Sequence, residues 1–198
     1  VERANQKLRR VQALGGRPQD ISDAPGFSGG TWNRADQIVF GSASGLYVVP
    51  AEGGTRKPSL LTTLEPSERG HFWPRFLPDG RHYLYLAASP EAAAGVVLVG
   101  ALDSKNKTEV MKVLSHAVYT DAGYLLFRVE NAVYAQPFNA RTFALSGKKE
   151  RVADEVLAGS HGQGSFDVSS NGVLIYYHRR SDWLVGDDNR DSWEFKLF

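Results

Sequence analysis

The first residue whose motif could do chemistry is Ser28, which lies in a Gly-x-Ser-x-Gly pattern with Gly26 and Gly30. A serine nucleophile in this pattern needs a buried strand before it and a helix after it, because the strained turn between them exposes the hydroxyl group. Residues 23–25 read Asp-Ala-Pro, and no helical pattern follows Gly30. The pattern therefore indicates a flexible loop, and a triad that uses Ser28 or Ser165 has no support from the sequence.

Histidine is the second residue type that could carry catalysis or bind a metal. The five histidines are His71, His82, His116, His161 and His178. None of them forms a His-Glu-x-x-His motif or another close metal-binding pair. His82 and His178 lie in or beside strand-like runs, so we expect them to pack or to cap. His161 lies in the glycine-rich run 159–164, where we expect the most exposed histidine; the run lacks the Lys-Ser/Thr of a phosphate-binding loop.

A third candidate is a calcium site formed by Asp187, Asn189 and Asp191. These residues occupy positions 1, 3 and 5 of an Asp-x-Asn-x-Asp loop, where oxygen ligands at alternate positions can converge on one ion. The match then ends, because Ser192 stands where the loop needs a glycine and Phe198 where it needs a bidentate glutamate. We therefore interpret the segment as a polar hairpin tip, keep these three residues as the metal candidates, and expect no cofactor.

The composition limits the classes of protein to which the chain can belong. Its 198 residues include 23 Lys and Arg, 22 Asp and Glu, 42% hydrophobic residues and no cysteine. A net charge of +1 gives no basis for nucleic-acid binding, and without cysteine there is no disulfide, Cys-ligated zinc or thiol nucleophile. Apolar runs such as residues 92–102 fall short of the roughly 18–20 residues of a membrane span. The chain begins at Val1 rather than at a Met, so we expect it to be part of a longer protein.

Candidate functional residues must be held in place by secondary structure. The sequence predicts that this secondary structure consists of short β-strands. The 20 Gly and 9 Pro separate short runs of Val, Leu, Ile, Phe and Tyr, and no segment keeps an apolar helical period over three turns. The best helical candidate is a single turn at 89–94. The predicted strands are 7–12, 38–42, 46–50, 71–76, 83–87, 96–101, 109–114, 124–129, 132–137, 165–168 and 173–178.

A motif recurs along the chain with a period of about 40–50 residues. Trp32-Asn33-Arg34 and Trp73-Pro74-Arg75 lie 41 residues apart, and each precedes a turn and an apolar strand. The turn recurs with Gly80, Gly123 and Gly172, spaced by 43 and 49 residues. Four strands in a repeat of this length are typical of propeller blades. The sequence therefore predicts an all-β protein, a β-propeller of about four to five four-stranded blades in an incomplete ring of a six-bladed type.

The predicted blades divide a single domain, residues 1–198, into repeat units. The units are 1–27 (partial), 28–66, 67–114, 115–158 and 159–198. A four-stranded sheet has two apolar faces, which it can cover only by packing against neighbouring sheets. An open ring leaves one face and one edge uncovered, so we expect self-association or a partner at the ring edge.

The run 72–86 resembles the repeat of the TolB-like, WD-repeat-like propellers, in which Pro-Asp-Gly-Lys/Arg follows an aromatic residue and precedes an apolar strand. Residues 169–176 are a second copy of this repeat. Longer stretches, 29–54 among them, resemble the C-terminal propeller of acidobacterial-type serine/threonine kinases. That resemblance implies a kinase domain and a membrane helix before the propeller, and a periplasmic or extracytoplasmic location. The chain contains no kinase motif, so no kinase residue is carried over.

Together these features favour a non-catalytic module, a sensor or a binding domain, in a bacterial signalling protein such as a receptor-type kinase. We expect a protein or small-ligand partner at the face of the propeller, where loops join the blades. The candidate binding residues are Trp32, Arg34, Arg69, His71, Trp73 and His161. The alternative is the propeller domain of a prolyl-oligopeptidase-like hydrolase or another propeller enzyme, for which the sequence identifies no catalytic residue.

Overall fold

The computed structural model describes residues 6–52, 57–90, 95–169 and 172–178, and the backbone of 192–197. These residues form strands and turns, with one short 3₁₀ helix at Ser160–Gly162. The all-β fold class is thereby confirmed. No helix within the described ranges is long and apolar enough to cross a membrane. The predicted helical turn at 89–94 falls largely on residues 91–94, which lie outside the described residues.

The strands form a hairpin followed by four antiparallel sets. The hairpin consists of β1 (Lys7–Arg10) and β2 (Gln19–Asp23). The first set is β3 (Gly30–Trp32), β4 (Gln37–Ser42), β5 (Gly45–Pro50) and β6 (Ser59–Leu60). The second set is β7 (Gly70–Phe76), β8 (His82–Ala88), β9 (Gly95–Ala101) and β10 (Ser104–Lys112). The third set is β11 (Ala117–Thr120), β12 (Tyr124–Val129), β13 (Ala132–Asn139), β14 (Ala144–Leu145) and β15 (Glu150–Ala153). The fourth set is β16 (Phe166–Val168), β17 (Val173–His178) and β18 (Ser192–Leu197).

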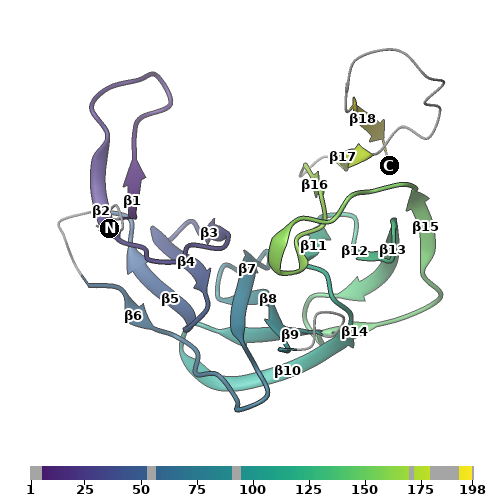
Figure 1. The fold of residues 1–198 in the computed structure, drawn as a ribbon, viewed down its shortest axis with the longest axis horizontal. Helices are drawn as coiled ribbons and strands as arrows, with labels where there is room; N and C mark the ends of the chain where they lie inside the picture. Colours follow the sequence, from purple (N-terminus) through teal and green to yellow (C-terminus); the bar gives the residue numbers. More distant parts are fainter. Residues whose placement is uncertain (1–5, 53–56, 91–94, 170–171, 179–191, 198) are drawn as a thin grey trace.

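The sets follow one another around an arc (Figure 1). The first strand of each set, β3, β7, β11 or β16, lies nearest the centre, and the later strands lie farther out. The β1–β2 hairpin and the fourth set stand on the two sides of the opening. One backbone pairing, of Ser42 with His71, joins the first two sets into a single sheet. This radial arrangement is that of a β-propeller, while the blade count and the bounds of the repeat units stay predictions.

The recurring turn has the same backbone geometry in all four sets. It joins the first strand to the second and closes with a hydrogen bond from the N–H of its fourth residue to the carbonyl of its first. The fourth residues are Asp36, Gly80, Gly123 and Gly172, with φ of +56°, +66°, +85° and +84°. Glycine adopts such a positive φ at little cost, and Asp is one of the few other residues that tolerate it. The copy of the motif without glycine therefore still forms the turn.

Alternation along each strand sends side chains into two different cores. In β8, Tyr83 and Tyr85 pack with residues of the first set, whereas Leu84 and Leu86 pack with residues of the third. Successive side chains of a strand point to opposite faces of its sheet. Both faces of the second set are apolar because each of them faces another sheet.

Four hydrophobic clusters fill the spaces between neighbouring units. They lie between the hairpin and the first set, the first and second sets, the second and third, and the third and fourth. One buried residue from each cluster, in chain order, is Ile21, Val39, Leu86 and Val133. Every internal sheet is thus covered on both faces, which distinguishes this fold from a two-layer sandwich.

Replacing Leu86 by Ala should destabilise the fold by about 2–5 kcal/mol, because the side chain is fully buried between the second and third sets and its removal leaves a cavity. Leu60→Ala is the matched control, since Leu60 in β6 is 46% exposed and its loss should cost less than about 1 kcal/mol. Urea unfolding followed by tryptophan fluorescence measures both. Equal losses of unfolding free energy in the two variants would contradict the assignment of this core.

Candidate functional site at the hub

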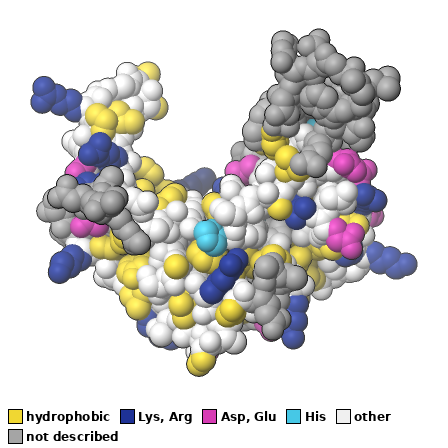
Figure 2. Space-filling view, viewed as in Figure 1, with side chains coloured by type: hydrophobic (Ala, Val, Ile, Leu, Met, Phe, Trp, Pro, Cys, Tyr) yellow, Lys and Arg dark blue, Asp and Glu magenta, His cyan; other side chains and the backbone are white. Residues whose placement is uncertain are grey.

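A pocket of about 350 Å³ lies at the centre of the arc, where the first strands of the sets meet. We call it the hub pocket. All four sets, with the loops that lead into them, contribute to its walls. The residues on which its properties depend are Gly29, Trp73, Arg75, His116, Ser165 and Asp167. The space-filling view shows the surface hollowed between the β1–β2 hairpin and the fourth set (Figure 2).

The hub pocket contains an ion pair between two sets that are not neighbours. Arg75 on β7 places a guanidinium nitrogen 2.5 Å from a carboxylate oxygen of Asp167 on β16. The other carboxylate oxygen of Asp167 accepts the backbone N–H of Val168 at 2.9 Å. The two side chains are 39% and 46% exposed, so the pair contributes at most about 1 kcal/mol to stability. The same exposure leaves both charges accessible to a ligand.

The aromatic wall of the pocket is Trp73, which the backbone around it holds in place. Its indole N–H donates to the carbonyl of His161 at 3.0 Å. Trp73 has a φ of +56° at an irregularity in the pairing of β7 with β8. Gly29 lies against the indole, and a Cβ at this position would come within 2.5 Å of a ring carbon. Because Gly29 also has a φ of +79°, the indole can lie here only if residue 29 is glycine.

His116 fixes the glycine-rich loop that closes the pocket. Its Nδ1 accepts the N–H of Gly164 at 3.0 Å, and its backbone N–H donates to the carbonyl of Gly162 at 2.8 Å. The ring stacks on Phe166 with centroids 4.5 Å apart. Burial lowers the pKa of His116 to about 4, and the positive charge of Arg75 acts in the same direction. The imidazole is therefore neutral at pH 7 with Nδ1 already in use, so His116 is a positioning residue rather than a base.

Two of the predicted binding residues belong to the hub. Trp73 lines the pocket, and His161 holds the indole through its carbonyl while its ring packs 4.8 Å from that of Phe72. Trp32 and Arg34 lie at the other end of β3, where the indole N–H of Trp32 donates to a carboxylate oxygen of Asp36. Neither of these two side chains lines the hub pocket.

The remaining two predicted binding residues lie in or beside a buried polar network between the first two sets. His71 is 1% exposed and lies 2.7 Å from the hydroxyl of Thr62 and 3.0 Å from a carboxylate oxygen of Glu68. Burial lowers the pKa of His71, although Glu68 acts in the opposite direction. The hydroxyl of Thr62 also accepts an N–H from β5, and the backbone N–H of Arg69 donates to β8. Through these hydrogen bonds, the network links β7 to the first set.

The other sequence candidates are placed as follows. The hydroxyl of Ser28 donates to the carbonyl of Gly26 at 3.2 Å, and a strand rather than a helix follows, so this is not a nucleophile turn. Ser165 lines the hub pocket. Asp187, Asn189 and Asp191 lie outside the described residues. Within the described part of the chain, no three His, Asp or Glu side chains are close enough together to hold a metal ion.

Sequence reasoning missed the two charged residues of the hub pocket, and the structure shows why. The spacing of 41 between Trp32 and Trp73 does not match the spacing of 44 between the equivalent turn residues Asp36 and Gly80. Trp32 lies one residue before its turn, whereas Trp73 lies four residues before it. The turn register places Arg75 within β7, facing the hub. Aligning the repeats on their turn residues, rather than on the tryptophans, was the signal that could have identified Arg75.

The fold is similar to that of several solved proteins. TolB from Acinetobacter baumannii aligns with 96% of this chain and 46% of its own, at a TM-score of 0.67 and 17% identity. A gluconolactonase from Xanthomonas campestris aligns with 88% of this chain and 63% of its own, at 0.63 and 17%. A puromycin hydrolase aligns with 87% of this chain and 32% of its own, at 0.61 and 15%. The chain therefore spans less than two thirds of each of these proteins, and identities this low show the fold alone.

No family model and no curated protein matches the chain. The resemblance to TolB-like propellers is confirmed at the level of the fold, whereas the link to serine/threonine kinases finds no support. The prediction that this chain is not an enzyme is contradicted, because two of the three proteins named above, which share its fold, are enzymes. That prediction rested on the lack of catalytic constellations in the sequence and on the family resemblance. In this fold, residues far apart in the sequence can still meet, as Arg75 and Asp167 do.

The stability of the fold should fall as the pH decreases from about 6.5 to about 4, because His116 binds a proton more readily in the unfolded chain than in the folded one. The lowered pKa corresponds to a loss of about 3 kcal/mol across this range, and His71 adds to it in the same direction. Urea unfolding at pH 7 and pH 4.5 measures the difference. In His116→Gln the difference should become smaller, and an unchanged difference would contradict the burial of a neutral imidazole.

Proposed function

We propose that this chain is the substrate-binding propeller of an enzyme, with the hub pocket as its site and with ester or lactone hydrolysis as its reaction. The ion pair of Arg75 with Asp167 carries the proposal, because it brings an accessible cation and an accessible carboxylate together at the centre of the fold. The similarity to a gluconolactonase and to a puromycin hydrolase supports it.

The chemistry of the pocket suits a small, polar acyl compound. The guanidinium of Arg75 would donate hydrogen bonds to the carbonyl oxygen of the substrate and stabilise the negative charge that develops on it. The carboxylate of Asp167 would take a proton from a water molecule as that water attacks the carbonyl carbon. The same proton would then pass to the leaving alkoxide oxygen, so that water adds across the broken ester bond. Trp73 would supply an apolar surface for the carbon skeleton.

The wider expectation of a ligand or protein partner at the propeller face is part of the same proposal. The hub pocket lies where the loops before β3, β11 and β16 meet strand β7, and loops that join the strand sets are where the sequence favoured binding. The repeat units, with the described sets as their cores, would then serve as blades that hold this face open. No described contact favours a kinase-linked sensor over an enzyme.

Asp167→Asn should lower the rate of hydrolysis at least about 100-fold, because it removes the proposed base and keeps the shape of the side chain. The assay is a panel of sugar lactones and of small carboxylic esters, followed by acid release at pH 7. Arg75→Gln should lower the rate as well. Asp121→Asn, at an exposed position in the β11–β12 turn, is the matched control and should keep full activity.

Two outcomes would contradict the proposal. One is a wild-type chain that binds compounds of the panel and turns none of them over, which would leave a binding site without catalysis. The other is an Asp167→Asn variant that keeps the wild-type rate, which would place the base elsewhere.

A further inference from the structure

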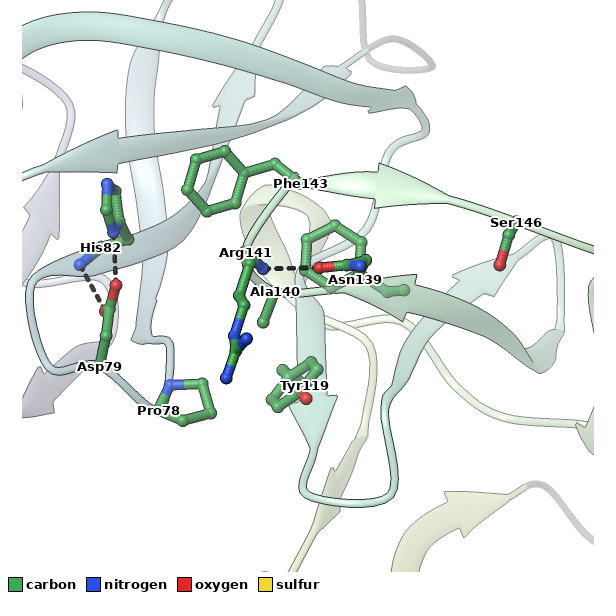
Figure 3. Close-up of a pocket in the computed structure, with 10 residues that line it drawn as sticks. Pro78, Asp79, His82, Tyr119, Asn139, Ala140, Arg141, Phe143 and Ser146 are labelled. Carbon is green, nitrogen blue, oxygen red and sulfur yellow. Dashed lines mark hydrogen bonds and ion pairs between the residues drawn. The ribbon is translucent and has the colours of Figure 1, made fainter.

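A second and larger hollow lies between the second and third sets, away from the hub. It has a volume of about 900 Å³, and we call it the turn cleft. Its walls are the β7–β8 turn with the start of β8, the β11 strand, and the loop from β13 to β14 (Figure 3). The residues on which its chemistry depends are Pro78, Asp79, His82, Tyr119, Arg141 and Phe143.

Arg141 is the group in the turn cleft that can bind an anion. Figure 3 shows its side chain extending from the β13–β14 loop toward Pro78, with Tyr119 on its other side in this view. Among the described residues, no carboxylate lies within ion-pair distance of its guanidinium. A guanidinium without a partner presents a fork of N–H donors that matches the two oxygens of a carboxylate.

The loop that carries Arg141 is held rigid by its own backbone. The side-chain oxygen of Asn139 accepts the N–H groups of Arg141 at 2.9 Å and Thr142 at 3.1 Å. The N–H of Phe143 donates to the carbonyl of Asn139 at 2.8 Å, and Phe143 has a φ of +58°. A bulky residue adopts this conformation only where its surroundings require it. The backbone of Arg141 is therefore fixed at the cleft before any ligand arrives, so binding need not order the loop.

The acidic group in the cleft does not compete with an anion for Arg141. One oxygen of Asp79 accepts the backbone N–H groups of Arg81 and His82, and the other lies 2.5 Å from the imidazole Nδ1 of His82. The guanidinium of Arg81 in turn bonds both carboxylate oxygens of Asp103 at 2.9 Å. Asp79, Arg81 and His82 therefore all have partners of their own. Among the described residues around the cleft, Arg141 is the positive charge that has none.

One part of the wall is apolar and aromatic. The ring of Phe143 lies 4.8 Å from the imidazole of His82, and the ring of Tyr119 packs edge-on against Phe138 at 6.0 Å. Pro78 and Ala140 belong to this part as well, Tyr119 adds a hydroxyl donor, and Asn139 and Ser146 are polar lining residues. A ligand that fits has one negative charge and an apolar body. A phosphate dianion fits less well, because a single cation balances only part of its charge.

We propose that the turn cleft is a second ligand site, which binds a small organic carboxylate with an aromatic or branched apolar body. The carboxylate bonds the guanidinium of Arg141, and the apolar body lies against Phe143 and Pro78. The proposal is independent of the hub pocket, because none of the residues that carry it lines that pocket.

Calorimetric titration of the full chain with phenylacetate tests this site. Phenylacetate should bind, and Arg141→Gln should weaken the binding at least about tenfold, because a charge-assisted pair is lost. Arg17→Gln, an exposed arginine in the β1–β2 loop, is the charge-matched control and should bind as the wild type does. Arg75→Gln should also bind as the wild type does.

Wild-type protein gives a test that needs no variant. Phenylacetamide keeps the ring and lacks the charge, and inorganic phosphate keeps the charge and lacks the ring, so each should bind at least about tenfold more weakly than phenylacetate. Binding of the amide or of phosphate as tight as that of phenylacetate would overturn the ligand class. Binding that survives in Arg141→Gln, or that is lost in Arg75→Gln, would overturn the location.

Discussion

The structure depends on one constraint, which is that every internal sheet has two apolar faces and neither face can remain in water. A strand such as β8 alternates tyrosines and leucines that belong to two separate cores. Only a neighbour on each side can cover both. Four clusters in series meet this requirement, and the radial arrangement of the sets follows, because sheets that twist and pack face to face turn around a common axis.

Much of the fold could be predicted because its strands and turns carry local signals. β12 and β17 have the predicted bounds, and three of the four turns carry a glycine at the position with positive φ, which the sequence shows. Other strands carry a weaker sequence signal for a physical reason. β10 begins five residues before the predicted strand, since its first half is an outer, exposed edge with Lys and Asn side chains. β3 and β6 are too short to show a period.

Little of the candidate site could be predicted, because its residues come together only through the arc. Arg75 and Asp167 are 92 residues apart in sequence and belong to the second and fourth sets, which are not adjacent in the arc. His116 is one of five histidines with no distinguishing neighbour in the sequence, and only its contact with Gly164 gives it a role. Arg141 was unremarked for the same reason, since the turn cleft exists only where the second set faces the third.

Because each set packs chiefly against its neighbours in the chain, a set at one end can unfold locally while the sets at the other end stay folded. In an array of this kind each unit is stabilised chiefly by its immediate neighbours. If the fourth set frayed, Asp167 and the Gly164 loop would move away from the centre of the fold. The hub pocket would then lose one of its sides. The turn cleft is formed by the second and third sets, so its lining would stay in place while the fourth set frays. The two hollows therefore differ in durability even though one chain builds both.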